Sequence, residues 1–428
     1  MLMKELGILL NKAIEKIKGT DSLIQLVSHL DADGLSSAAI MASVLSQMGK
    51  DFQITFVKMV KQDIVKVLND RKPKLVIFTD IGSGYLDVLK EIDSEIIVLD
   101  HHEIEGEPSE RMIHINPENF DLELSGAGTT YLLAKEILQN NSLAPLAIVG
   151  TIGDVNYSPN SKIFENPFVE TEMGLNLFGR FTRPLYKSIE YAGLPGIDNS
   201  SKAIQFLSEA GIESQRDGEW LTFSNLNKEE KKKLADAIVK ESLKDKNFKK
   251  EKIFSKTLTL NSFPDELRDP KEFAMILNAC ANMNEPAVGI ALCMGSPKAL
   301  EVARGVVRGY RRLIANYMRW VEKNPECVKR TESADFLLAD DNINENLIGT
   351  IVSMLFKPSE KTLFGLANGE DGIKVSARSK DVNVRKIVSE AAKVCNGRGG
   401  GHEFAAGATI PADTRDKFID SCEDLLKA

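Results

Sequence analysis

Five histidines occur in the 428 residues, and three of them accompany carboxylates in a pattern that predicts a two-metal site. The acidic groups lie in four segments, each at the end of an apolar run: His29-x-Asp31-x-Asp33, Asp80, Asp100-His101-His102 and Asp154. Carboxylates combined with neutral imidazoles are the ligands expected of a dinuclear Mn²⁺ or Mg²⁺ centre. The imidazoles favour Mn²⁺, because all-oxygen sets suit Mg²⁺ better. Such a pair of ions suits the hydrolysis of a phosphoester.

The spacing also predicts how two ions would share the ligands. Asp31 and Asp33 leave one strand end two residues apart and can therefore address two ions, with Asp80 between them as the bridge. A lone Asp-x-Asp or His-His pair is common on surfaces, but four such clusters at strand ends are hard to obtain by structural accident. The predicted metal ligands are His29, Asp31, Asp33, Asp80, His101 and Asp154.

The elements that must position these residues alternate between strand and helix from residue 20 to about 160. Strand patterns occur at 23–27, 52–57, 75–79, 95–99 and 145–152, and helical patterns at 35–48, 64–69, 85–90 and 127–138. This alternation predicts a parallel sheet covered on both faces. The carboxyl ends of parallel strands converge on one edge, where ligands bind, so residues far apart in the sequence can meet there.

The remainder of the chain predicts two further regions. Residues 196–334 are mostly helical, with expected helices at 228–242, 269–278 and 299–323, whereas 335–428 mix strands and helices, including a hairpin at 361–378. The fold class expected is therefore α/β. We predict three parts: 1–195 with the metal site, 196–334 as a connecting or inserted region suited to partner docking, and 335–428 as a smaller α/β domain.

Several other groups could contact a phosphate, and each has a structural alternative. Gly397-Arg-Gly-Gly-Gly-His402 could present backbone N–H groups to an anion or form a turn before an edge strand. Arg378 could clamp a phosphate or be an exposed strand arginine. Ser125-Gly-Ala-Gly128 could cradle a phosphate, although close packing is the preferred interpretation. His114 is expected to be structural or to line the substrate site.

Composition limits the classes of protein that remain. The net charge of −8 neither supports nor excludes a polyanionic substrate, because five carboxylates belong to the predicted site and two divalent ions would add positive charge there. The five cysteines have no paired spacing, which favours a reducing cytosol and a cytoplasmic location. No apolar run approaches the ~20 residues that span a bilayer, so no membrane association is expected.

Three motifs together resemble the DHH phosphoesterase superfamily with its C-terminal DHHA1 domain. They are Asp100-His101-His102, His29-x-Asp31-x-Asp33-Gly34 and Gly399-Gly-Gly-His402, and the similarity runs the whole length. Phe178-Gly-Arg-Phe-Thr-Arg-Pro184 makes the middle most similar to archaeal RecJ-type single-strand exonucleases.

The resemblance implies a two-domain clamp in which a glycine-rich loop closes over the substrate phosphate. It assigns the six residues above as metal ligands. Asp100 would orient His101, and His102 would contact the scissile phosphate or assist the leaving oxygen. The groups implied to contact the substrate are Arg378, Gly399, Gly400, Gly401 and His402.

The resemblance further implies a substrate and a partner. The expected activity is exonucleolytic hydrolysis of single-stranded DNA or RNA, and archaeal members associate with the GINS replication complex. One alternative is a phosphodiesterase for short oligonucleotides or cyclic dinucleotides, and His29 is also typical of that branch. Another is a non-catalytic replisome scaffold, as in a related eukaryotic helicase subunit. The complete ligand set argues against the scaffold, and the long middle region argues against the small substrate.

Overall fold

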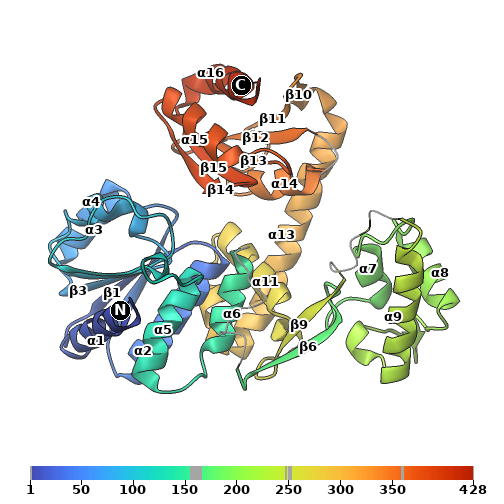
Figure 1. Cartoon of the computed structure of the whole chain (residues 1–428), viewed down its shortest axis with the longest axis horizontal. Helices are drawn as coiled ribbons and strands as arrows, with labels where there is room; N and C mark the ends of the chain where they lie inside the picture. The colour runs from blue at the N-terminus through green and yellow to red at the C-terminus, as the bar shows by residue number, and fades with distance from the viewer. Residues whose placement is uncertain (1, 155–165, 246–247, 249–252, 358–360, 428) are drawn as a thin grey trace. The chain divides into compact units, whose positions relative to one another are not determined.

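Apolar and β-branched runs form a five-stranded parallel sheet in the N-terminal part of the computed structural model (Figure 1). The structure describes residues 2–154, 166–245, 248, 253–357 and 361–427. The strand order is β2-β1-β3-β4-β5. The strands are β1 (Ile24–His29), β2 (Phe52–Val57), β3 (Leu75–Thr79), β4 (Glu95–Leu99) and β5 (Met112–Ile115).

Helices cover both faces of this sheet, as predicted. One face carries α1 (Leu2–Lys18), α2 (Ala32–Gln47) and α5 (Gly126–Leu138), and the other carries α3 (Gln62–Arg71) and α4 (Leu86–Leu89) (Figure 1). Side chains of β3 alternate between the two apolar layers, and Val76 and Phe78 pack against α3 and α4. The fold class is therefore confirmed as α/β.

One element of the first region was predicted wrongly. The run expected as a strand over 145–152 is a helix, α6 (Ala144–Gly153), which packs against α2 and α5. Pro145 lies in its first turn, where a proline is tolerated. The run is apolar on all sides because the helix is buried on all sides, and such a pattern does not separate a buried helix from a buried strand.

The middle of the chain is mostly helical, also as predicted. It contains two small antiparallel sheets, one of β6 (Val169–Leu175) with β9 (Phe254–Leu260) and one of β7 (Gln215–Arg216) with β8 (Glu219–Trp220). A separate apolar core joins the helices between β6 and β9. The helices between β6 and β9 are α7 (Leu185–Glu190), α8 (Ser200–Glu209) and α9 (Lys228–Ser242). After β9 follow α10 (Asp265–Arg268), α11 (Pro270–Asn282), α12 (Pro286–Cys293) and α13 (Pro297–Lys323).

The C-terminal region has a six-stranded mixed sheet of order β10-β11-β12-β13-β15-β14. Helices α15 and α16 pack on one face of this sheet, and α14 with the end of α13 packs on the other. Its elements are β10 (Val328–Arg330), β11 (Ala334–Asp340), α14 (Ile348–Leu355), β12 (Thr362–Gly369), β13 (Gly372–Arg378), α15 (Val384–Val394), β14 (Arg398–His402), β15 (Ala405–Ile410) and α16 (Arg415–Lys427).

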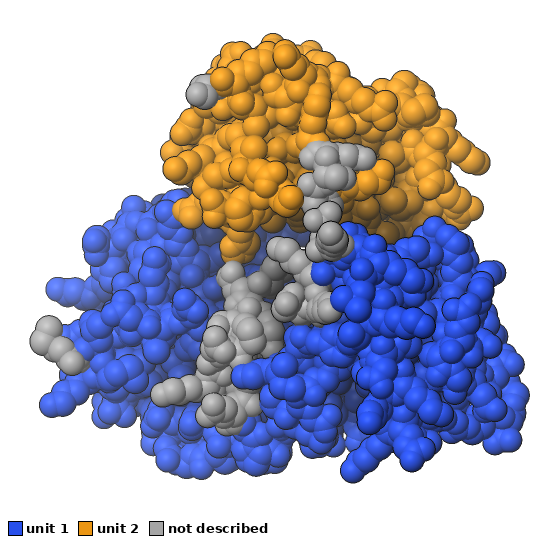
Figure 2. Space-filling view, turned by 45° about the vertical axis from the view of Figure 1, so that its right-hand side comes forward, with its two compact units in different colours: residues 1–304 blue, residues 305–428 orange. Residues whose placement is uncertain are grey.

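The chain divides into two compact units, residues 1–304 and 305–428, coloured separately in Figure 2. The passage between them lies within α13. The three-part division at 195/196 and 334/335 stays a prediction. No helix among the described residues is long and apolar enough to cross a membrane.

Candidate functional site

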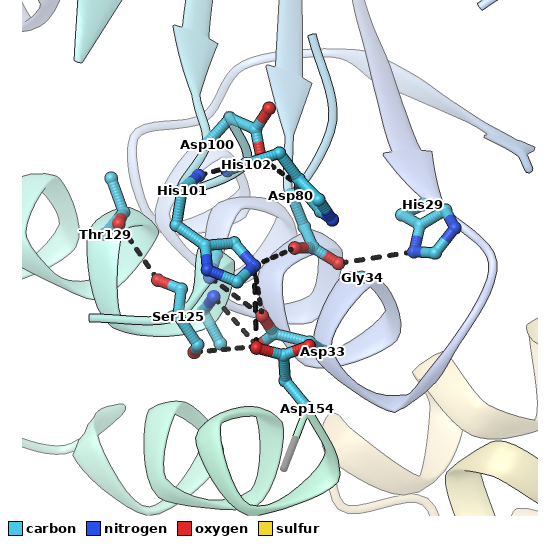
Figure 3. A network of polar contacts seen from close by, with 12 residues as sticks. His29, Asp33, Gly34, Asp80, Asp100, His101, His102, Ser125, Thr129 and Asp154 are labelled. Carbon is cyan, nitrogen blue, oxygen red and sulfur yellow. Dashed lines mark hydrogen bonds and ion pairs between the residues drawn. The ribbon is translucent and has the colours of Figure 1, made fainter. Parts of the chain in front are cut away.

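Three parallel strands end at one edge of the N-terminal sheet and deliver the predicted residues there. His29 ends β1, Asp80 follows β3, and the segment Asp100-His101-His102 follows β4. Because β1 pairs with β3 and β3 pairs with β4, these three ends are neighbours. Their side chains point towards one another in Figure 3. The convergence expected for the carboxyl ends of parallel strands is observed.

Asp80 has the backbone conformation that aims its carboxylate into the cluster. Its φ is +58°, in the left-handed region that few residues other than glycine adopt, and which aspartate tolerates better than most. Its Oδ2 lies 3.6 Å from His29 Nδ1, and its Oδ1 lies 3.4 Å from His101 Nε2. The two oxygens of one buried carboxylate therefore face two different imidazoles.

The turn from β1 into α2 places the other two aspartates of the first motif. Asp31 is the N-cap of α2, and its Oδ1 accepts a hydrogen bond from the N–H of Gly34 at 2.9 Å. Its Oδ2 lies 2.9 Å from His29 Nδ1. Asp33 lies in the first turn of α2 and is fully buried. The two carboxylates thus leave the turn in different directions.

Asp33 is held by the N-terminus of α5. Its carboxylate accepts hydrogen bonds from Ser125 Oγ (2.9 Å), from the N–H of Gly126 (2.7 Å) and from the N–H of Ala127 (3.0 Å) (Figure 3). A methyl group at Gly126 would overlap the Asp80 carboxylate. The segment predicted to serve close packing does so, and its N–H groups bind a carboxylate of the chain itself.

The six predicted ligands form two adjacent sets. His29, Asp31 and Asp80 offer atoms within 4.8 Å of one another, and so do Asp33, His101 and Asp154. Asp80 adjoins the second set through His101, whose Nε2 also lies 3.7 Å from Asp154 Oδ2. Asp154 is the C-cap of α6, so a helix end supplies this carboxylate instead of the predicted strand end.

Buried polar atoms without partners test whether these residues suit metal ions. Both oxygens of Asp80, Nδ1 of His29 and Nε2 of His101 are buried, and within the described part of the chain none of them makes a well-formed hydrogen bond. Each instead lies 2.9 to 3.8 Å from an oppositely charged group of the cluster. Unpaired buried polar atoms are costly, and natural proteins rarely keep them without a function. The donor set of carboxylate oxygens and imidazoles fits two divalent cations.

The electrostatics of the cluster show an excess of negative charge. Burial lowers the pKa of His101, but contact with Asp80 and the charges of Asp33 and Asp154 outweigh it and raise that pKa to about 10. Burial and the charge of Asp80 raise the pKa of Asp33 well above its usual value. Burial likewise raises the pKa of Asp154. Bound cations would supply positive charge and so reduce the repulsion between these buried carboxylates.

The first set has a similar balance. Burial lowers the pKa of His29, but the charges of Asp31 and Asp80 outweigh it, and the pKa is raised well above the usual value. Burial raises the pKa of Asp31, but the charge and hydrogen bond of His29 and the N–H of Gly34 have the larger effect, so its pKa is lowered overall.

Asp100 holds His102 rather than the imidazole of His101. Its Oδ1 lies 2.7 Å from His102 Nδ1 and accepts a hydrogen bond from the backbone N–H of His101 at 2.8 Å, while Oδ2 accepts from the N–H of Ser83. Burial raises the pKa of Asp100, but the hydrogen bond and charge of His102 lower it overall. The side chain of His102 is 47% exposed. Burial lowers the pKa of His102, but the hydrogen bond and charge of Asp100 have the larger effect and raise it overall. The imidazole of His102 is thus held at Nδ1 by Asp100 and remains accessible to solvent.

A buried polar network supports this arrangement from behind. His114 Nε2 lies 2.9 Å from Ser83 Oγ, and Asn116 donates to Ser83 Oγ (3.1 Å) and to the carbonyl of His102 (2.8 Å). Burial lowers the pKa of His114. His114 is therefore structural, which is one of the two alternatives expected for it.

One residue of the site was not predicted from the sequence. Asn278, in α11, accepts a hydrogen bond at its Oδ1 from the backbone N–H of Ala32 (3.0 Å), between the two aspartates of the first motif. The two groups are 246 residues apart in the chain. The sequence signal was a single polar side chain, Asn278, within the otherwise apolar run 274–281 near the C-terminal end of α11.

The residues predicted to contact substrate phosphates belong to the other unit. Arg378 donates from Nε to Ser353 Oγ (2.9 Å) and from Nη1 to Ser376 Oγ and to the Ala377 carbonyl. Burial lowers the pKa of its guanidinium. The glycine-rich segment is not a loop but an edge strand, β14, paired with β15. It comprises Gly399, Gly400, Gly401 and His402 after Arg398.

Family models match three successive regions of the chain. The N-terminal domain of the DHH family matches residues 23–151, the DHH-CID domain matches 177–255, and the DHHA1 domain matches 332–428. The uncharacterized protein MJ0831 of Methanocaldococcus jannaschii is 28% identical over 97% of this chain and 96% of its own length. The single-stranded-DNA-specific exonuclease RecJ of Bacillus subtilis is 26% identical over 34% of this chain and 21% of its own.

Solved structures share the fold. RecJ of Thermus thermophilus in complex with Mn²⁺ matches with a TM-score of 0.62 at 18% identity, covering 100% of this chain and 55% of that one. CDC45 of Entamoeba histolytica matches with a TM-score of 0.64 at 12% identity, covering 99% of both chains. At these identities the likeness concerns the fold alone. With the three matched domains in order and the motif Asp100-His101-His102 directly after β4, the chain carries the N-terminal domain of the DHH family, a DHH-CID domain and a C-terminal DHHA1 domain.

Proposed function

We propose that this protein hydrolyses phosphodiester bonds of single-stranded DNA or RNA from an end, with two divalent cations at the Asp80 cluster. The observation that carries the proposal is the pair of ligand sets, His29-Asp31-Asp80 and Asp33-His101-Asp154, with the buried oxygens of Asp80 facing both. Proteins of the same fold have been solved with Mn²⁺ and with Mg²⁺, and sequence relatives include a single-stranded-DNA-specific exonuclease.

The proposed roles follow from the contacts of each group. The six ligand residues would hold the cations, which supply Lewis-acid stabilisation of charge on the phosphoryl oxygens. His102 is oriented by Asp100 at Nδ1, and its other nitrogen, which makes no hydrogen bond to any described residue, would donate a proton to the leaving oxygen. Arg378 would receive a further phosphate at Nη2, since Nε and Nη1 are engaged within its own unit.

Two alternatives make different demands on the same site. A non-catalytic replisome scaffold would leave the two buried Asp80 oxygens, which make no well-formed hydrogen bond among the described residues, without a task, so the cluster favours an enzyme. The fold shared with CDC45 keeps that alternative open to test. A phosphodiesterase for short oligonucleotides or cyclic dinucleotides would use the same chemistry but prefer short substrates. Association with a GINS complex stays a prediction.

One assay separates these possibilities. Single-stranded DNA and RNA of several lengths, labelled at either end, are incubated with Mn²⁺ and the products resolved at nucleotide resolution. We expect successive shortening from one end and no cleavage of duplex interior. Cleavage confined to substrates of a few nucleotides would favour the small-substrate alternative, and no cleavage of any substrate would favour the scaffold.

Replacing His102 with glutamine separates chemistry from metal binding. Glutamine keeps a polar group near Asp100 but cannot transfer a proton, so turnover should fall by about 10²- to 10⁴-fold, the range of a lost general acid. Both metals should remain, because His102 is not one of the six proposed ligands and its Nδ1 is held by Asp100, although it shares a further group of possible ligand atoms with Asp80, Asp100 and His101. Elemental analysis counts the ions per chain, and Glu105→Gln, an exposed change on the same loop, serves as the control. Loss of one ion per chain would make His102 a ligand.

A further inference from the structure

The surface around α7 carries aromatic rings and cations in alternation, away from the metal cluster. The guanidinium of Arg183 lies 4.6 Å from the centroid of the Phe178 ring and 5.5 Å from that of Tyr191. Lys187 Nζ lies 5.9 Å from the same Tyr191 centroid. The series of contacts continues from Lys187 to Tyr186 and from Tyr186 to Trp220. We call the six residues of this series the aromatic ladder: Phe178, Arg183, Tyr191, Lys187, Tyr186 and Trp220.

The end of this ladder comes from a different element of the chain. Lys187 Nζ lies 5.7 Å from the Tyr186 centroid, and the rings of Tyr186 and Trp220 lie 4.7 Å apart at an interplanar angle of 55°. Trp220 belongs to β8, which pairs with β7, whereas Tyr186 and Lys187 belong to α7, labelled in Figure 1. Two separate elements therefore contribute to one run of contacts, in which Tyr186 is partly buried against the apolar core of the middle region.

Two of its rings are unusually accessible for their size. Tyr191 is 62% exposed and Trp220 is 42% exposed, although large aromatic side chains are usually mostly buried in single chains. These two exposed rings are linked through Lys187 and Tyr186, and a group of accessible aromatic side chains is a candidate binding surface. Aromatic faces stack on unpaired bases whatever their sequence, and neighbouring cations pair with the phosphates between them.

The cations of the ladder are held in place. Lys187 donates to Glu190 (2.9 Å) and to Ser200 (2.8 Å), and the bond to Glu190 raises its pKa. Arg216 lies outside the six residues of the ladder, on the strand paired with that of Trp220, and its exposed guanidinium donates to Glu230. Because these charges are partly balanced by glutamates, the rings should contribute more to binding than the net charge does.

The segment that begins the ladder is anchored to the helix that supports the metal cluster. Arg180, only 5% exposed, donates to Asp269 (2.9 Å) at the N-cap of α11 and to the carbonyl of Leu258. Thr182 hydrogen-bonds Glu272 in α11. The same helix carries Asn278, which binds the backbone between Asp31 and Asp33. The ladder and the cluster thus share one helix within one unit.

We propose that the aromatic ladder is a stacking surface for single-stranded nucleic acid, which holds unpaired nucleotides remote from the bond being cut. This inference rests on the proposed function and adds a second contact region to it. A duplex keeps its bases inside, so only an unpaired strand offers faces to Tyr191 and Trp220. Phosphates of that strand would meet Arg183 and Arg216.

The protein contains two tryptophans, Trp220 and Trp320, which makes binding at the ladder directly observable. In full-length protein carrying Trp320→Phe, with Asp80→Asn added to stop cleavage, oligo-dT or oligo-U of about 10 to 20 nucleotides should quench the remaining Trp220 fluorescence. A duplex of equal length should not. Poly-anions without bases, such as polyphosphate, are the control for charge alone.

Affinity measurements on single variants complete the test. Tyr191→Ala and Trp220→Ala should each weaken single-strand binding by about 5- to 100-fold, the range for loss of one stacking ring. Met173→Ala, which removes an exposed apolar side chain (73%) on β6 without removing a ring, should change nothing. In the background with an intact Asp80, cleavage of a dinucleotide should be unaffected by either ladder change.

The outcomes separate this inference from the proposed function. Quenching together with weakened binding supports the ladder, even where the parent protein cleaves no strand and the proposed function fails. Unchanged affinity in both variants, in a protein that does cleave single strands, overturns the ladder and leaves the function intact. Equal quenching by polyphosphate would show that the surface binds charge and not bases, and would also overturn it. Absence of quenching by both oligo-dT and oligo-U would also overturn it.

Discussion

Replacing Asp80 with asparagine is expected to reduce turnover more than the loss of any other single ligand. The two oxygens of Asp80 face His29 and His101, so one substitution disturbs both ligand sets. We expect a loss of at least ~10²-fold, the size of the effect when a group that stabilises the transition state is removed. Asp154→Asn touches only the second set and should cost less.

Asparagine is the informative substitution because the backbone at this position is unusual. With φ at +58°, alanine would add conformational strain, whereas asparagine tolerates the left-handed region and nearly keeps the volume of the buried side chain. In EDTA the variant should unfold at no lower temperature than the parent, because one negative charge has been removed from a buried acidic cluster. Asp93→Asn makes the same charge change at an exposed position. Turnover near that of the parent would exclude Asp80 from the site.

The sheet and the residues at its edge could be predicted because two independent patterns agree. Runs such as Leu75–Thr79 and Glu95–Leu99 are short, apolar and rich in β-branched residues, and helical periodicity lies between them. A parallel sheet then places whatever follows each strand at a common edge. The meeting of His29, Asp80 and His101 follows from that topology alone.

The helix that supplies Asp154 could not be distinguished by the same means. A run that is buried on every side has no amphipathic period, so its composition is compatible with strand or helix. The position of Asp154 was nonetheless useful, because either element brings its last residue to the cluster. The prediction was wrong about the type of element before Asp154, but the Asp154 carboxylate still lies beside Asp33 and His101.

The supporting contacts were beyond sequence reasoning for a different reason. Asn278 meets Ala32, and Ser125 meets Asp33, through hydrogen bonds between segments that no local pattern relates. The composition of the glycine-rich segment 397–402 was compatible with an anion-binding loop or a turn. In the structure, residues 398–402 pair with β15 and form an edge strand. Pairing partners, and hence edge strands, depend on tertiary structure.

Removing divalent cations is expected to abolish activity entirely, because both ligand sets would lose their cations at once. Asp33 and Asp80 are each about 1% exposed, and Asp31 and Asp154 lie beside them, so the metal-free cluster holds four carboxylates with two histidines. Activity should disappear in EDTA, return with Mn²⁺ and return less well with Mg²⁺, since the set includes imidazole nitrogens. Full activity in protein shown by elemental analysis to be metal-free would contradict the mechanism.

Stability provides a measure of metal binding that does not depend on turnover. A ligand that binds only the folded protein stabilises it by about 2.7 kcal/mol for each site at a concentration 100 times its dissociation constant. The melting temperature should therefore rise with Mn²⁺ in the parent, and by less in Asp80→Asn. His101→Asn should narrow the difference between Mn²⁺ and Mg²⁺, because it replaces an imidazole nitrogen by an amide oxygen in the second set. If the preference for Mn²⁺ were unchanged, the imidazole of His101 would not be what selects the metal.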